Sequence, residues 1–132
     1  MRGEIDPQAA AKEYGELLKA NFGDGGLDMI LLGMGDDGHT ASLFPGSPNL
    51  RSALNPAAAA GCVGMWAPSA PQPRLSLNVS ALLDSRHIVI LIAGESKLRA
   101  YLAAGAAGPM EDMPVRAVLR QQRAPVEVIW AP

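Results

Sequence analysis

The sequence predicts an α/β fold, a three-layer sandwich built around a mainly parallel sheet. Three apolar segments of strand length, residues 27–33, 87–93 and 126–130, alternate along the chain with segments of helical character. The first two are almost continuously apolar, which is typical of strands buried on both faces of a parallel sheet. Strands that alternate with helices favour a sandwich in which helices cover such a sheet.

The first expected helix covers residues 7 to about 21. Asp6 is a suitable N-cap, and Pro7 occupies the first helical position, where its missing N–H costs nothing. Apolar side chains recur at helical spacing up to Phe22, and the glycine-rich residues 23–26 end the pattern. The first buried strand follows, and it leads into a glycine-rich turn.

The rest of the chain continues this alternation. Residues 74–79 alternate apolar with polar side chains, as in a strand with one exposed face. The second buried strand, residues 87–93, is followed by Gly94 and a helix from about residue 95 to 104. A short helix at 114–119 precedes the closing strand.

Length and composition indicate a single domain, residues 1–132. Of the 132 residues 48% are hydrophobic and 18% charged, which is typical of a globular protein with a core. A net charge of -2 creates no basic field for nucleic acid, and no apolar stretch is long enough for a membrane span. The only cysteine, Cys62, cannot form an internal disulfide, and no secretory signal precedes the first helix. We therefore expect a cytoplasmic protein with no nucleic-acid or membrane partner, in which Cys62 is a packing residue.

The most informative segment is residues 33–46, with the sequence Gly-Met-Gly-Asp-Asp-Gly-His-Thr-Ala-Ser-Leu-Phe-Pro-Gly. Three of its glycines match the G-x-G-x-x-G fingerprint of dinucleotide-binding sites. Asp36 and Asp37, however, would place negative charge against a pyrophosphate, and no acid follows about twenty residues later to bind a ribose. The pattern does not favour a dinucleotide site.

His39 is the residue of this segment best suited to chemistry, because it follows glycines in a turn where bulk is excluded and function concentrates. In open α/β sheets, ligands bind at the carboxyl ends of the strands. There we expect His39 to lie near Lys97, in the first turn of a helix, and near Arg74. Two cations and a helix N-terminus can form a phosphate clamp. His87 opens a strand with no acid beside it in the sequence, and we expect it to be structural.

Two other chemistries are less well supported. Only Asp36, Asp37 and His39 cluster, which is too few ligands for a closed metal site. Ser42 would need a sharp G-x-S-x-G turn to act as a nucleophile, and that pattern is missing. We expect Ser42 to lie in a helix that follows the turn.

Residues 32–46 resemble the signature of the 6-phosphogluconolactonases, the hydrolases of the second step of the oxidative pentose phosphate pathway. The similarity continues through residues 73–77, 94–97 and 114–130. Glucosamine-6-phosphate deaminases share the G-x-G-x-D-G-H core but continue differently, whereas residues 40–44 match the lactonases. An amino-sugar phosphate deaminase or isomerase remains an alternative.

The resemblance implies a three-layer α/β fold, no cofactor, no metal, and 6-phospho-D-glucono-1,5-lactone as substrate. By position, His39 would be the general base that takes a proton from the attacking water, and Asp37 would orient its imidazole or loop. Gly35, Arg74 and Lys97 would bind substrate, with the two cations on the phosphate. A general base typically contributes a factor of about 10²–10⁴.

The resemblance covers only the C-terminal half or so of the family fold. The serine/glycine-rich phosphate loop that the family carries before this segment is not found here, so we expect the N-terminal half of the fold to be absent. The chain is then either a lactone hydrolase or a non-catalytic fragment that needs that half. An exposed edge of its sheet would favour self-association.

Overall fold

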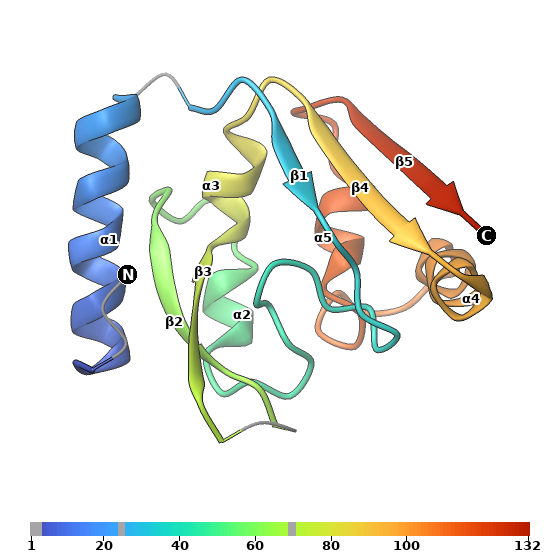
Figure 1. Ribbon diagram of the computed structural model, residues 1–132, viewed down its shortest axis with the longest axis horizontal. Coiled ribbons are helices and arrows are strands. Elements are labelled where there is room, and N and C mark those ends of the chain that lie inside the picture. Colours follow the sequence, from blue (N-terminus) through green and yellow to red (C-terminus); the bar gives the residue numbers. More distant parts are fainter. Residues whose placement is uncertain (1–3, 24–25, 69–70) are drawn as a thin grey trace.

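The computed structural model describes residues 4–23, 26–68 and 71–132. Helices and strands alternate, which confirms the predicted α/β class (Figure 1). In chain order the elements are α1 (Pro7–Phe22), β1 (Ile30–Leu32), α2 (Leu50–Ala53), β2 (Cys62–Trp66), β3 (Pro73–Leu77), α3 (Val79–Leu83), β4 (Ile88–Ala93), α4 (Glu95–Gly105), α5 (Val115–Leu119) and β5 (Val126–Ala131).

The strands form two separate sheets. The larger is fully parallel, with the order β1-β4-β5, and the smaller is the antiparallel hairpin of β2 and β3. Helix α1 packs on this hairpin, and the parallel sheet lies on the other side of the molecule (Figure 1). Because β1 and β4 run in the same direction, the loop after β1 and the helix after β4 both begin at the carboxyl end of the sheet.

Helix α1 begins and ends as predicted. The Asp6 carboxylate accepts hydrogen bonds of 3.0 Å from the backbone N–H groups of Gln8 and Ala9, which is the geometry of an N-cap. The helix ends at Gly23, whose φ of +66° is accessible to glycine without strain.

One face of the parallel sheet forms the core with α3 and α5. Alternate strand residues are buried on this face, since successive side chains in a strand point to opposite sides. The core side chains from these elements are Ile30, Leu32, Ile88, Ile90, Ile92, Val79, Leu82, Val115 and Val118.

The opposite face of the sheet is largely open, so the prediction that β1 and β4 are buried on both faces was wrong. Leu31 is 63% exposed, Leu91 49% and Ile129 43%, although Val89 on the same face is only 9% exposed. Leu91 and Ile129 are register partners in the sheet, so their side chains share this open face. An apolar run predicts burial on two sides, but the described helices cover only one.

Two short helices were not predicted. The strand expected at residues 74–79 ends at Leu77, because Asn78 accepts a 2.9 Å hydrogen bond from the N–H of Ala81 and caps α3. The glycine-rich turn after β1 does not lead directly into a helix either, since α2 begins only at Leu50. Among the described helices, none combines the length and apolarity that crossing a bilayer requires.

Candidate active site

The glycine-rich segment after β1 folds into a closed loop. Within it, the N–H of Gly35 donates to the carbonyl of His39 at 2.8 Å, and the N–H of Gly38 donates to the carbonyl of Gly35 at 3.0 Å. The hydroxyl of Thr40, which is fully buried, donates to the carbonyl of Gly33 at 2.8 Å. These bonds satisfy the backbone of a turn that carries polar side chains on its outer side.

Helix α5 is hydrogen-bonded to this loop at Gly38. The N–H of Val115 donates to the Gly38 carbonyl at 2.9 Å. Gly38 has a φ of +75°, and a Cβ there would lie 2.8 Å from the Cβ of Met113. Glycine is therefore required by both the backbone conformation and the close packing.

His39 and Asp37 form the central pair of the loop. Nδ1 of His39 lies 2.6 Å from Oδ1 of Asp37, and the same oxygen accepts the backbone N–H of His39 at 3.1 Å. The imidazole also contacts the ring of Phe44, with 4.6 Å between ring centroids. The His39 side chain is 32% exposed, and its second nitrogen, Nε2, is not used in the contact with Asp37. A carboxylate in this position can orient an imidazole and select its tautomer.

The contacts with His39 perturb the acidity of Asp37. Partial burial by itself raises the pKa of Asp37, but the hydrogen bonds from the backbone and ring of His39 and the nearby imidazole charge outweigh it and lower the pKa below the ordinary 3.8. A lowered pKa means that the ionised carboxylate stabilises the folded state above its ordinary pKa. That contribution is lost as pH falls through the lowered value.

Gly35 packs directly against the side chains of His39 and Asp37. A Cβ at position 35 would be 2.1 Å from Nδ1 of His39 and 2.4 Å from Oδ1 of Asp37. The missing side chain makes room for the imidazole and the carboxylate to meet. A contact of Gly35 with substrate stays a prediction.

Lys97 reaches this loop from α4, as expected from the parallel order of β1 and β4. Its Nζ lies 3.3 Å from Oδ1 of Asp36. From the sequence, Asp36 was expected to disfavour pyrophosphate and to be one of too few candidate metal ligands, and its pairing with Lys97 was not predicted. Each residue follows one of two expected neighbouring strands, which brings them to the same end of the sheet, but their contact also depends on side-chain direction.

Arg74 lies on β3, the strand to which Ser42 is hydrogen-bonded. Its side chain is exposed, and a guanidinium nitrogen lies 3.5 Å from the carbonyl of Gln72 in its own turn. Arg74 shares one face of β3 with Ser76, whose Oγ accepts the N–H of Ser42 at 3.1 Å. Ser42 therefore lies in a turn tied to β3, and the prediction that it belongs to a helix was wrong.

His87 lies at the other end of the parallel sheet. Its Nε2 is 3.6 Å from a carboxylate oxygen of Glu127 on β5. The sequence places no acid beside His87, because Glu127 is distant along the chain and only strand pairing brings it close. In the part of the chain that the structure describes, no three His, Cys, Asp or Glu side chains are arranged to hold a metal ion.

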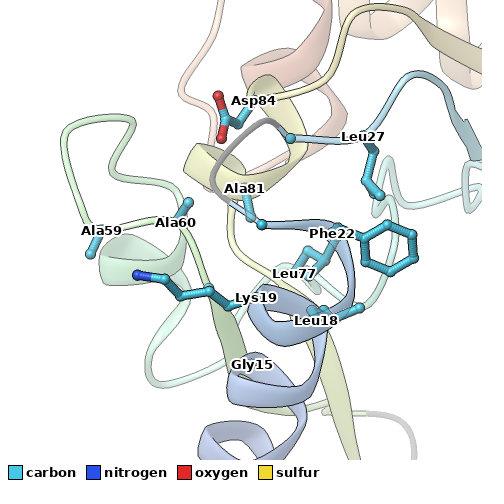
Figure 2. Close-up of a pocket in the computed structure, with 13 residues that line it drawn as sticks. Gly15, Leu18, Lys19, Phe22, Leu27, Ala59, Ala60, Leu77, Ala81 and Asp84 are labelled. Carbon is cyan, nitrogen blue, oxygen red and sulfur yellow. The ribbon is translucent and has the colours of Figure 1, made fainter.

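The structure also contains a cavity of about 350 Å³ beside α1 (Figure 2). Lys19 reaches over its opening towards the loop of Ala59 and Ala60, and Asp84 lies at another side (Figure 2). None of the predicted site residues lines this cavity. We favour the loop of His39 over the cavity as the reactive site, because the loop holds the oriented imidazole. The residues lining the cavity are Gly15, Leu18, Lys19, Phe22, Gly23, Gly26, Leu27, Ala59, Ala60, Gly61, Leu77, Ala81 and Asp84.

Comparison with known proteins shows the family of the chain. Residues 1–130 match the model of the family described as glucosamine-6-phosphate isomerases/6-phosphogluconolactonase. The chain is 43% identical over 132 residues to a 6-phosphogluconolactonase of Pseudomonas aeruginosa, covering 98% of this chain and 54% of the relative. It is also 43% identical over 106 residues to a 6-phosphogluconolactonase of Rhizobium meliloti, covering 80% of this chain and 46% of the relative.

The fold is similar to that of a solved relative. The crystal structure of a 6-phosphogluconolactonase from Shewanella baltica matches with a TM-score of 0.74 and 44% sequence identity, over 80% of this chain and 44% of that one. The chain spans about half the length of the curated relatives it matches.

Proposed function

Since the chain belongs to the family of glucosamine-6-phosphate isomerases and 6-phosphogluconolactonases, we propose that it carries the histidine loop of an enzyme that hydrolyses 6-phospho-D-glucono-1,5-lactone. The observation that carries the proposal is the 2.6 Å contact between His39 Nδ1 and Asp37 Oδ1. Residues 1–132 would form one domain-sized part of that enzyme. The 6-phosphogluconolactonase relatives from two bacteria support lactone hydrolysis over deamination.

In this proposal His39 is the general base. The Asp37 carboxylate accepts the proton on Nδ1, which leaves the lone pair of Nε2 free to take a proton from water. The resulting hydroxide attacks the lactone carbonyl and forms a tetrahedral intermediate. When the intermediate collapses, the ring C–O bond breaks and the imidazolium returns its proton to the leaving oxygen, giving 6-phosphogluconate.

Lys97 and Arg74 would bind the phosphate of the substrate. Lys97 supports this role through its position beside the loop, 3.3 Å from Asp36. Arg74 would have to turn from its present contact with Gln72 to take part. An ammonium and a guanidinium both form charge-assisted hydrogen bonds to phosphate oxygens. The proposed substrate is an anion that bilayers exclude, which fits the prediction that the protein acts in the cytoplasm.

A second possibility is that catalysis needs a further polypeptide layer. It is favoured by the open face of the parallel sheet, on which Leu31, Leu91 and Ile129 are exposed, because parallel sheets are normally covered on both faces. In this case the chain is inactive alone and gains activity when that layer is supplied. Self-association of the chain through β1, an edge strand of the described sheet, is a competing outcome.

The test is a lactonase assay with His39 variants. The chain is assayed alone and together with the part of the Pseudomonas aeruginosa relative that it does not match. We expect His39→Ala to lower kcat/KM by about 10²–10⁴-fold and Asp37→Asn to lower it by a smaller factor, because Asp37 acts only through the imidazole.

His87→Ala is the matched control, since His87 is also paired with a carboxylate but lies at the opposite end of the sheet. Full activity in His39→Ala would contradict the assigned role. Release of ammonia from glucosamine 6-phosphate, with no lactone hydrolysis, would favour the deaminase alternative.

A further inference from the structure

The ion pair between Asp36 and Lys97 is not explained by hydrolysis at His39. We infer that Asp36 is a positioning residue that holds the ammonium of Lys97 at the histidine loop and weakens its affinity for phosphate. The inference rests on the proposed function, in which Lys97 contacts the phosphate of the substrate.

The two neighbouring aspartates have different partners. Asp37 is engaged by the backbone N–H and the ring of His39, whereas Asp36 points to Lys97. The side chain of Asp36 is 66% exposed and that of Lys97 only 28%, so the lysine is the more confined member of the pair. An ion pair this accessible to water contributes little to fold stability. We therefore expect the Asp36–Lys97 ion pair to affect the binding of ligands to Lys97 more than the stability of the fold.

Hydrogen bonds to the backbone fix the two segments that carry Asp36 and Lys97, the loop after β1 and the start of α4. The N–H of Gly94, at the start of α4, donates to the carbonyl of Ala131 at 2.8 Å, and the indole of Trp130 donates to the carbonyl of Gly94 at 3.1 Å. On the other side, the bond from Val115 to Gly38 anchors the loop that carries Asp36. A phosphate that binds Lys97 in this position therefore lies near Asp36.

Electrostatic repulsion determines whether Asp36 raises or lowers the affinity of Lys97 for phosphate. An oxygen of a phosphate bound to Lys97 lies about 3 Å from Nζ. With Nζ itself 3.3 Å from Asp36, that oxygen comes within roughly 6 Å of the carboxylate. Like charges at this separation repel even through solvent. Asp36 thus lowers the affinity of the site for any phosphate, including that of the product, and favours release.

The experiment measures binding of inorganic phosphate by titration calorimetry at low ionic strength, independently of hydrolysis. We expect Asp36→Asn to bind phosphate about threefold to tenfold more tightly than the wild type. Lys97→Gln should bind more weakly than the wild type, and the double variant should bind no more tightly than Lys97→Gln. Asp36→Ser repeats the test with a smaller side chain.

Asp28→Asn is the matched control. Asp28 is an exposed aspartate paired with Arg86 at 3.1 Å, and it precedes β1, at the opposite end of the sheet. Its neutralisation changes the net charge equally but should leave phosphate affinity within about twofold. Unchanged or weaker binding in Asp36→Asn, an equal gain in Asp28→Asn, or no detectable phosphate binding in any variant would each overturn the inference.

Kinetics separates this inference from the proposed function. Where the lactone is hydrolysed, Asp36→Asn should lower KM by the same factor without raising kcat, because the phosphate is bound equally in the ground and transition states. Hydrolysis that needs His39 but is insensitive to Asp36 would overturn the inference alone. Tighter phosphate binding by Asp36→Asn with no hydrolysis in any assembly would overturn the proposed function alone.

Discussion

Asp36 and Asp37 are adjacent in the chain but contact different residues: Asp36 pairs with Lys97, and Asp37 pairs with His39. A tight turn makes this possible, because successive side chains leave it in different directions. The residue type alone does not reveal which carboxylate orients the histidine. That assignment follows from the contact of Asp37 with both the backbone and the ring of His39.

A single carbon atom added at Gly35 tests the contact between His39 and Asp37. We expect Gly35→Ala to separate His39 from Asp37, because the added Cβ would lie 2.1 Å from the imidazole nitrogen. The pKa of Asp37 should then rise towards its ordinary value, as measured by NMR titration, and any lactonase activity should fall more than tenfold.

The control for this variant is Gly33→Ala in the same loop. A Cβ at Gly33 meets nothing within 4 Å, so the pKa of Asp37 and the activity should stay close to those of the wild type. If Gly35→Ala left the pKa of Asp37 unchanged, the loop would be more pliable than its packing indicates.

Among the elements, α4 depends on a neighbouring helix to complete its C-terminal end. Arg116 of α5 is only 6% exposed, and its guanidinium donates to the carbonyls of Ala103, Ala104 and Pro109 at 3.2, 3.3 and 2.9 Å. The last carbonyls of a helix lack intrahelical partners. A planar cation with several donors satisfies them and also interacts favourably with the helix dipole.

We therefore expect Arg116→Met to lower the free energy of unfolding by about 2–4 kcal/mol, because it removes three hydrogen bonds donated by a buried cation. Urea denaturation measures the change. Arg123→Met is the control, since Arg123 is exposed and donates a single 3.3 Å bond to Pro56; its effect should stay within about 0.5 kcal/mol. Equal losses in the two variants would argue against capping by Arg116.

At the scale of the whole molecule, the described residues leave an apolar sheet face exposed at Leu31, Leu91 and Ile129, with β1 as an edge strand of that sheet. Parallel strands rarely remain exposed in this way, and such surfaces favour association. We expect the wild-type chain to self-associate with increasing concentration. Leu31→Lys, on β1, should weaken this association while changing stability little, since Leu31 is already 63% exposed.

Sedimentation velocity at several concentrations measures this effect. Leu102→Lys is the matched control, because Leu102 is also 63% exposed but lies on α4, outside the sheet. A wild-type chain that stays monomeric throughout, or an equal effect of the two substitutions, would contradict association through the sheet.

Much of the candidate site could be predicted from the sequence because it depends on local order. The turn after β1 delivers His39, the helix after β4 delivers Lys97, and the parallel arrangement of neighbouring strands brings them to one edge. The pairing of Asp36 with Lys97 and of His87 with Glu127 could not be derived in the same way. Both join segments distant in the chain, and their contacts depend on strand register and side-chain direction.

By itself, the sequence determined the α/β class, the limits of α1 and the family of this protein, because caps, apolar runs and a long motif are properties of neighbouring residues. Only the tertiary structure decided that Asn78 ends β3 by capping α3, that β3 pairs with β2 apart from the parallel sheet, and that one face of that sheet is open. The physical reason is that hydrophobicity records a preference for burial. Which surface covers an apolar strand depends on elements packed in three dimensions.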